Sequence, residues 1–149
     1  MELKETVYAE CIKILEAKIA NLKSEIDAVQ ESAISDTKSS MGDKYETGRE
    51  VMMQERNRLG GQYDVYVKQL AALRNLDPTK SSEEVGRGSL VETDKGVFYI
   101  SVPLGNIKID EKPVFVISEG APIAKAMMGM RVKESHTFNK QPYLIKSIK

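Results

Sequence analysis

The chain has 149 residues, of which 41% are hydrophobic and 30% charged, and its 22 basic and 22 acidic residues cancel. This length allows one ordinary domain or two small ones. The cancelled charge argues against a strongly basic nucleic-acid-binding protein. Aromatic residues make up 6% of the chain and Trp is absent, which is typical of a protein that is in part a charged helical structure with little core of its own.

Cysteine and histidine occur once each, as Cys11 and His136. A single cysteine excludes an intramolecular disulfide and a thiolate cluster for zinc, and we expect a reduced, partly buried thiol. We expect a structural role for His136, because the two residues lie too far apart in the chain to indicate a nucleophilic pair. Residues 1–5 do not begin a signal peptide, and no apolar run approaches the roughly 18 residues of a membrane span. We therefore expect a cytoplasmic protein without a membrane partner.

A heptad pattern of apolar residues occupies the first part of the chain. Alternating steps of four and three separate Tyr8, Ile12, Leu15, Ile19, Leu22, Ile26, Val29 and Ala33. A seam sustained over several heptads predicts a coiled-coil helix. The pattern ends at residues 35–43, where Ser, Thr, Asp and Gly favour turns and caps.

A second heptad pattern follows this turn-rich segment. Its members are Tyr45, Met52, Leu59, Tyr66 and Leu73, supported by Tyr63 and Leu70. Gly60 and Gly61 interrupt it, and since each Gly costs about 1 kcal/mol relative to Ala, we expect a kink or a close helix contact there. Pro78 ends the helix, because proline disfavours the helical conformation of the residue before it. Two such seams predict an antiparallel helical hairpin over about residues 5–76.

The period changes to that of strands in the last part of the chain. β-branched and aromatic residues, separated by Gly, Pro, Asp and Asn, predict strands at residues 89–93, 96–102, 113–117 and 143–148, with a further one within 131–138. A short helix is expected at residues 122–129, with Pro122 in its first turn and Gly129 just past its end. We expect Met127, Met128 and Met130 to pack against the sheet.

The predicted fold class is therefore α+β, an N-terminal antiparallel coiled-coil hairpin followed by a small antiparallel β domain with one short helix. The sequence divides into a hairpin (residues 1–77), a linker (residues 78–84) and a C-terminal domain (residues 85–149).

The C-terminal part carries motifs of a known family. Val85-Gly86-Arg87-Gly88-Ser89-Leu90-Val91, Glu119-Gly120-Ala121-Pro122-Ile123-Ala124-Lys125-Ala126-Met127-Met128-Gly129 and Tyr143-Leu144-Ile145 follow one another in the chain. With the hairpin before them, these motifs resemble the Gre family of bacterial transcript-cleavage factors over nearly the whole chain. The resemblance implies an FKBP-like C-terminal domain that docks on RNA polymerase and a coiled coil that enters the polymerase secondary channel.

The tip of the predicted hairpin resembles that of family members that promote cleavage. Gly42-Asp43-Lys44-Tyr45-Glu46 matches the family's Gly-Asp-x-x-Glu. The resemblance implies that Asp43 and Glu46 are the catalytic carboxylates and help to bind a Mg²⁺ ion shared with the polymerase, on backtracked RNA. Asp36 is a weaker candidate outside the motif. The chain itself would be no enzyme, would have no cofactor of its own and would act as a monomer.

This chemistry suits paired carboxylates. Hydrolysis of an RNA phosphodiester needs charge neutralisation at the attacking and leaving oxygens, which two divalent metals supply. Mg²⁺ is often held by one or two protein carboxylates together with water and phosphate. Asp43 and Glu46, three residues apart, could converge on one face of a helical turn.

Three alternatives stay open. The family's Asn-Ala-Glu-Tyr after the tip motif is here Thr47-Gly48-Arg49-Glu50, and the altered tip could block the secondary channel and inhibit or modulate the polymerase without cleavage. A prolyl isomerase would need an apolar pocket lined by aromatic residues. A dimerising coiled coil would show the same heptads.

The basic residues of the second helix are expected to be a solvated face; they are Arg49, Arg56, Arg58, Lys68 and Arg74.

Overall fold

The computed structural model describes residues 2–38 and 43–149, with side chains described for residues 2–32 and 48–149. The chain packs as two compact units. The hairpin unit comprises residues 13–70, and the sheet unit comprises residues 1–12 and 71–149. The ends of both long helices thus pack with the strands, whereas the sequence-based division placed them in a hairpin of residues 1–77. The prediction that residues 1–77 form a domain of their own stays a prediction.

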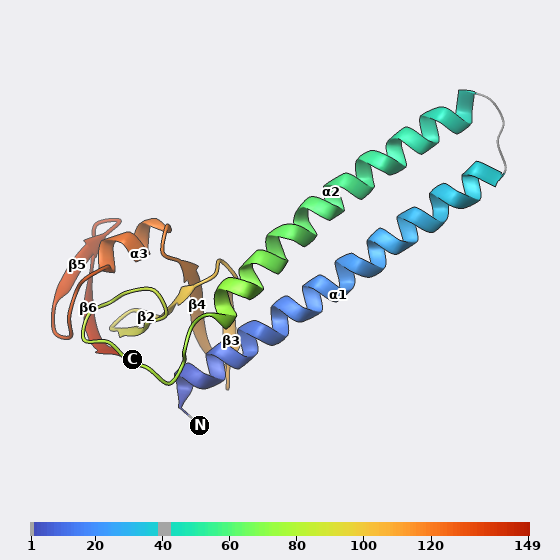
Figure 1. The fold of residues 1–149 in the computed structure, drawn as a ribbon. Coiled ribbons are helices and arrows are strands. Elements are labelled where there is room, and N and C mark those ends of the chain that lie inside the picture. The colour runs from blue at the N-terminus through green and yellow to red at the C-terminus, as the bar shows by residue number, and fades with distance from the viewer. Residues whose placement is uncertain (1, 39–42) are drawn as a thin grey trace. The chain divides into compact units, whose positions relative to one another are not determined.

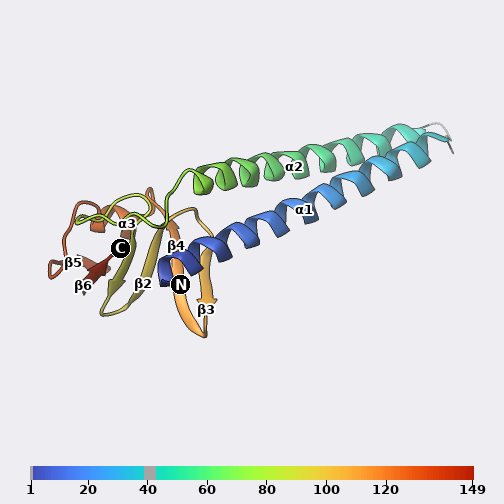
Figure 2. The same ribbon diagram turned by 60° about the horizontal axis from the view of Figure 1, so that its bottom comes forward.

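Two long helices form the hairpin, as the heptads predicted. Helix α1 spans Leu3–Lys38 and helix α2 spans Asp43–Arg74. Within the hairpin unit they lie side by side and run in opposite directions (Figure 1), as Figure 2 shows from a second direction. No described helix combines the length and the apolar character that crossing a membrane requires.

The predicted seams supply the contact between the two helices. Leu15, Leu22, Leu59 and Leu70 are buried. The other described seam residues of the hairpin unit are partly buried: Ile19, Ile26, Val29, Met52, Tyr63 and Tyr66. Each fully buried Leu contributes roughly 1.5–3 kcal/mol by leaving water. Most intervening polar residues of the hairpin unit stay exposed, and the heptad prediction is confirmed for the described side chains.

Gly60 and Gly61 do not mark a close approach of the helices. Helix α2 continues through both residues, and a Cβ atom added at either one meets none of the described atoms within 4 Å. The expected close contact is therefore wrong, and the glycines are open positions within a helix.

Replacing Gly60 and Gly61 by Ala should stabilise the chain by about 1 kcal/mol per site, because Ala loses less backbone entropy in a helix. Urea unfolding followed by far-UV circular dichroism measures the change. The control is Gly88→Ala, where φ is +88° and the new Cβ would lie 3.3 Å from Leu76 Cδ2. This control should destabilise by about 1–2 kcal/mol. A less stable Gly60→Ala/Gly61→Ala double variant would contradict the open-helix interpretation.

The sheet unit contains a six-stranded sheet with strand order β3-β4-β2-β1-β6-β5. The strands span Leu90–Thr93 (β1), Gly96–Ser101 (β2), Gly105–Ile109 (β3), Lys112–Ser118 (β4), Ser135–Phe138 (β5) and Gln141–Ile148 (β6). Strands β2 and β4 pair in parallel, and the other neighbours pair antiparallel. The expected strands and the predicted α+β fold class are confirmed, with one parallel pair in a mainly antiparallel sheet. Strand β3 takes the edge position, so that the chain returns along β4 in the direction of β2.

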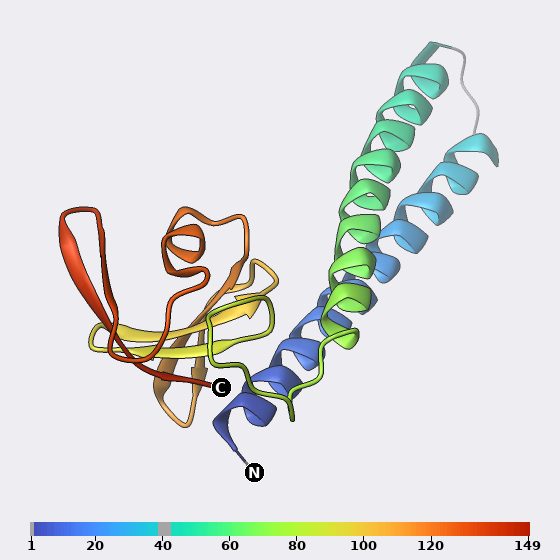
Figure 3. The ribbon, with the colours of Figure 1, turned by 60° about the vertical axis from the view of Figure 1, so that its left-hand side comes forward.

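Helix α3, Pro122–Met127, covers one face of the sheet (Figure 3). Pro122 begins the helix, and Gly129 follows it with φ +81°, as the sequence predicted. Ala124 and Met127 are fully buried in a core with residues of β1, β2 and β6, and Met130 packs against that core. Met128 is exposed, so the expectation that the methionines pack inward holds for two of the three.

The other face of the sheet is covered by the first turns of α1. Tyr99 on β2 is fully buried and lies close enough to Cys11 and Tyr8 for their charges to influence it. Val7 and Cys11 are fully buried on the same side of α1. Burial, followed by the nearby Glu10, raises the pKa of the Cys11 thiol to about 12, so this thiol is protonated and unreactive at neutral pH.

Residues 78–84, predicted as a linker, are tied to the sheet unit by specific contacts. The Lys4 ammonium donates to the carbonyl oxygen of Lys80 at 2.5 Å. Glu84 pairs in a β-bridge with Arg131, whose guanidinium lies 3.0 Å from the Glu84 carboxylate. The segment is thus part of a packed structure.

Candidate functional site

The turn of the hairpin coincides with the predicted acidic motif. Helix α1 ends at Lys38 and α2 begins at Asp43, so the backbone of Asp43 and Glu46 forms the first turn of α2. Residues three apart on a helix are neighbours on its surface, and acidic residues are favourable in a first turn because of the helix dipole. Gly42 lies outside the described residues, and so do the side chains of Asp36, Asp43 and Glu46. Their role stays a prediction.

An apolar groove lies on the hairpin one to two turns from the motif. It has a volume of about 290 Å³ and is lined by Ala28, Val29, Ser32, Val51, Met52 and Glu55. Val51 and Met53 are exposed by 59% and 53%. Val29 and Met52 belong to the predicted seams, so the groove continues the apolar contact between the helices close to the motif.

The basic residues of α2 are partly engaged within the hairpin unit. The Arg58 guanidinium forms a two-point contact with the Glu55 carboxylate, with Nε to Oε2 at 3.1 Å. With the Gln30 amide oxygen turned towards it, the Arg56 guanidinium donates to Gln30 from Nε at 2.7 Å and from Nη2 at 3.1 Å. These contacts fit the expectation of a solvated helix surface rather than a surface reserved for nucleic acid.

The residues that could hold a metal are few. Among the described side chains, no group of three or more His, Cys, Asp and Glu residues is arranged to bind a metal ion. His136 stacks on the Tyr143 ring with a centroid distance of 5.2 Å and an interplanar angle of 7°. Desolvation lowers the pKa of His136, which favours the neutral ring in this stack. This is a structural position, as the sequence suggested.

The aromatic residues of the sheet unit fill its core. The Phe98 and Phe115 rings stack at 5.4 Å, and Phe98 meets Tyr143 edge-on at 6.3 Å. Phe98 is buried, and both partners pack against the same cluster. Residues used in this way cannot also line a substrate pocket, which weakens the prolyl isomerase alternative.

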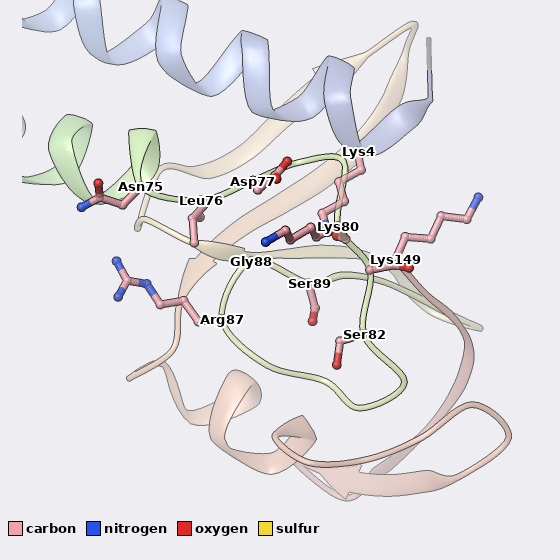
Figure 4. A pocket seen from close by; sticks show the side chains of 11 residues that line it. Lys4, Asn75, Leu76, Asp77, Lys80, Ser82, Arg87, Gly88, Ser89 and Lys149 are labelled. Atoms are coloured by element: carbon pink, nitrogen blue, oxygen red, sulfur yellow. The ribbon is translucent and has the colours of Figure 1, made fainter.

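One cavity in the sheet unit was not predicted from the sequence. It has a volume of about 300 Å³, and Figure 4 shows the side chains that line it. The lining comes from the first turn of α1, the segment after α2, the loop before β1 and the last residue: Lys4, Asn75, Leu76, Asp77, Lys80, Ser81, Ser82, Arg87, Gly88, Ser89 and Lys149. Lys4 and Lys149 are far from residues 75–89 in the sequence, and only folding brings the three regions together.

The chain is similar to a solved structure described as "Structure of the transcription factor Gfh1". The two share 20% sequence identity over 92% of each chain, with a TM-score of 0.35. No family model and no curated protein matches the chain.

Proposed function

We propose that this protein is a Gre-like accessory factor of bacterial RNA polymerase. In this proposal the hairpin enters the secondary channel, and Asp43 and Glu46 help the polymerase to hold a Mg²⁺ ion that promotes cleavage of backtracked RNA. The protein acts as a cytoplasmic monomer and has no catalytic activity of its own. A transcript-cleavage assay on stalled elongation complexes of the cognate polymerase tests the proposal.

One observation carries the proposal. The Gly-Asp-x-x-Glu motif falls where α1 has ended and α2 begins, so the backbone of Asp43 and Glu46 lies at the end of a helical hairpin. Such an end can reach a buried active centre that a globular surface cannot enter. Two carboxylates also match the ligand demand of a weakly held Mg²⁺ ion.

A second candidate function is inhibition of the same polymerase without cleavage. Arg49 follows Glu46 by three residues on α2, and its side chain is exposed. A cation at this spacing is a neighbour of Glu46 on the helix surface and would compete with a metal ion for the carboxylate. Slower elongation without cleavage in the same assay would favour this candidate.

The hairpin is expected to supply activity, while the sheet unit supplies binding. We therefore predict that a variant with residues 24–57 replaced by a short glycine-containing turn competes with the parent for polymerase but stimulates no cleavage. This variant keeps the buried Leu22 and Leu59 and all of the sheet unit. Competition binding with labelled parent protein measures the first effect, and the cleavage assay measures the second.

The whole sheet unit is kept in this variant for a structural reason. A fragment of residues 84–149 alone would lack the α1 turns that cover Tyr99 and would expose that face of the sheet. Failure of the shortened variant to bind polymerase, with its circular dichroism otherwise intact, would show that the hairpin itself is needed for docking.

A further inference from the structure

The cavity in the sheet unit contains a buried ammonium group. Lys4 is only 4% exposed, and its Nζ atom donates to the Lys80 carbonyl oxygen at 2.5 Å. Desolvation lowers the pKa of Lys4, whereas the charges of Asp77 and Glu2 oppose that shift. An ammonium group has three N–H donors, and the hydrogen bonds to described residues account for one of them. A buried cation in this position gains from a further anionic partner.

Basic side chains outnumber acidic ones around this cavity. Four basic residues line it, together with one acidic side chain, that of Asp77; the basic residues are Lys4, Lys80, Arg87 and Lys149. Figure 4 shows the Lys80 and Arg87 side chains extending to the same side, towards Leu76 and Asn75, whereas the Lys149 side chain extends away.

The single acidic side chain is already engaged. Asp77 Oδ1 accepts from the Thr79 hydroxyl at 2.5 Å and from the Thr79 N–H at 2.9 Å. These hydrogen bonds, more than the nearby lysines, lower the pKa of Asp77. Asp77 is therefore ionised at neutral pH, but one of its oxygens is committed to Thr79, and the surrounding cations retain an excess of positive charge.

A neutral donor completes the lining. Ser89 is buried, and its Oγ accepts from the Gly86 N–H at 3.0 Å, which leaves its hydroxyl hydrogen free to donate. Gly88 beside it has no side chain to fill the cavity. Lys4, Lys80 and Arg87 line the same cavity, and ammonium and guanidinium groups are donors that suit a tetrahedral oxyanion.

We propose that this cavity is a binding site for a free small phosphate anion, orthophosphate or pyrophosphate. Lys4 and Lys80 provide positive charge, and Arg87 provides a two-point hydrogen-bonding group. A bound anion would contact Lys4 in the first turn of α1 and also Lys80 and Arg87, and would so link these segments. It would therefore stabilise the packing of the sheet unit by mass action. This proposal is independent of any interaction with polymerase.

Isothermal titration calorimetry of the full chain with sodium orthophosphate and sodium pyrophosphate, at an ionic strength fixed with sodium chloride, tests the site. We expect saturable binding of at least one of the two anions at one site per chain. Lys4→Met and Arg87→Gln should each raise the Kd about tenfold or more, because each removes a charged hydrogen-bond donor. Lys149→Gln, which removes one positive charge from the same lining, should change the Kd by less than about twofold.

Two further measurements show where the anion binds and whether each variant is folded. Amide NMR shifts on titration should be largest at Lys80, Gly88 and Ser89, and circular dichroism checks that each variant is folded. Arg87 is exposed, so Arg87→Gln tests the site even where Lys4→Met fails to fold. Absence of saturable binding by the parent would overturn the proposal. Equal weakening by Arg87→Gln and Lys149→Gln would also overturn it, since it would show a diffuse response to charge.

Discussion

Replacing Asp43 by Asn, or Glu46 by Gln, is expected to reduce stimulated transcript cleavage at least about tenfold, the scale of effect seen when support for a catalytic metal is lost. Each change keeps the shape of the side chain but removes the charge that would bind Mg²⁺. Asn is also a good residue at a helix start, so the melting temperature and the affinity for polymerase should stay near those of the parent. Cleavage by stalled elongation complexes, at matched occupancy of the polymerase, measures the effect.

The double variant should lose little more activity than the worse single variant, because residues that act as a unit are not additive. A higher Mg²⁺ concentration should partly restore cleavage if weaker metal binding is the lesion. Glu50→Gln is the matched control, because Glu50 is an exposed acid on the same helix but outside the motif. A double variant as active as the parent would end the proposed role of both residues.

The hairpin could be predicted from the sequence because its stabilising contacts repeat along the chain. Leu15 and Leu22 were found by their spacing, and both are buried. Val7 and Cys11 are fully buried as well, although they lie beside the predicted seam rather than in it. The first turns of α1 pack against the sheet, so the buried side there is set by tertiary contacts that a heptad pattern does not contain.

The missed strand β3 shows the limit of turn signals. It is joined to β4 by Asp110 and Glu111, which have φ of +50° and +67°. Two-residue hairpin turns of this kind are normally recognised in a sequence by Asn-Gly or Asp-Gly, and Asp-Glu is not such a signal. Without a visible turn, residues 105–109 read as a loop, and the parallel pairing of β2 with β4 could not be foreseen.

The two candidate sites differ in how far the sequence could reveal them. The acidic motif is continuous, so the resemblance to the family's Gly-Asp-x-x-Glu singles out Asp43 and Glu46 within one segment. The basic cavity joins Lys4 to Lys80 and Arg87, and no local pattern relates these residues. Sequence reasoning can find a site that one segment carries, whereas a site assembled by tertiary packing needs the fold.

Replacing Tyr99 by Ala is expected to destabilise the chain by about 3–5 kcal/mol, the usual cost of removing a large buried aromatic side chain. Tyr99 is fully buried on the sheet face that the first turns of α1 cover. That loss is a large part of the roughly 5–15 kcal/mol that stabilises an ordinary domain. Urea unfolding measured by far-UV circular dichroism, with the free energy extrapolated to water, tests this prediction.

Tyr99→Phe separates the packing of the ring from the contribution of its hydroxyl. Among the described residues the Tyr99 hydroxyl has no hydrogen-bond partner, and burial, with Cys11 and Tyr8 adding to it, raises the pKa of this phenol. Removing a buried hydroxyl that lacks a partner should leave stability unchanged within about 0.5 kcal/mol or increase it, because its desolvation cost is removed as well. A loss above about 1.5 kcal/mol in Tyr99→Phe would show that the hydroxyl makes a stabilising hydrogen bond. The α1-facing side of the sheet would then be held by a polar contact as well as by apolar packing.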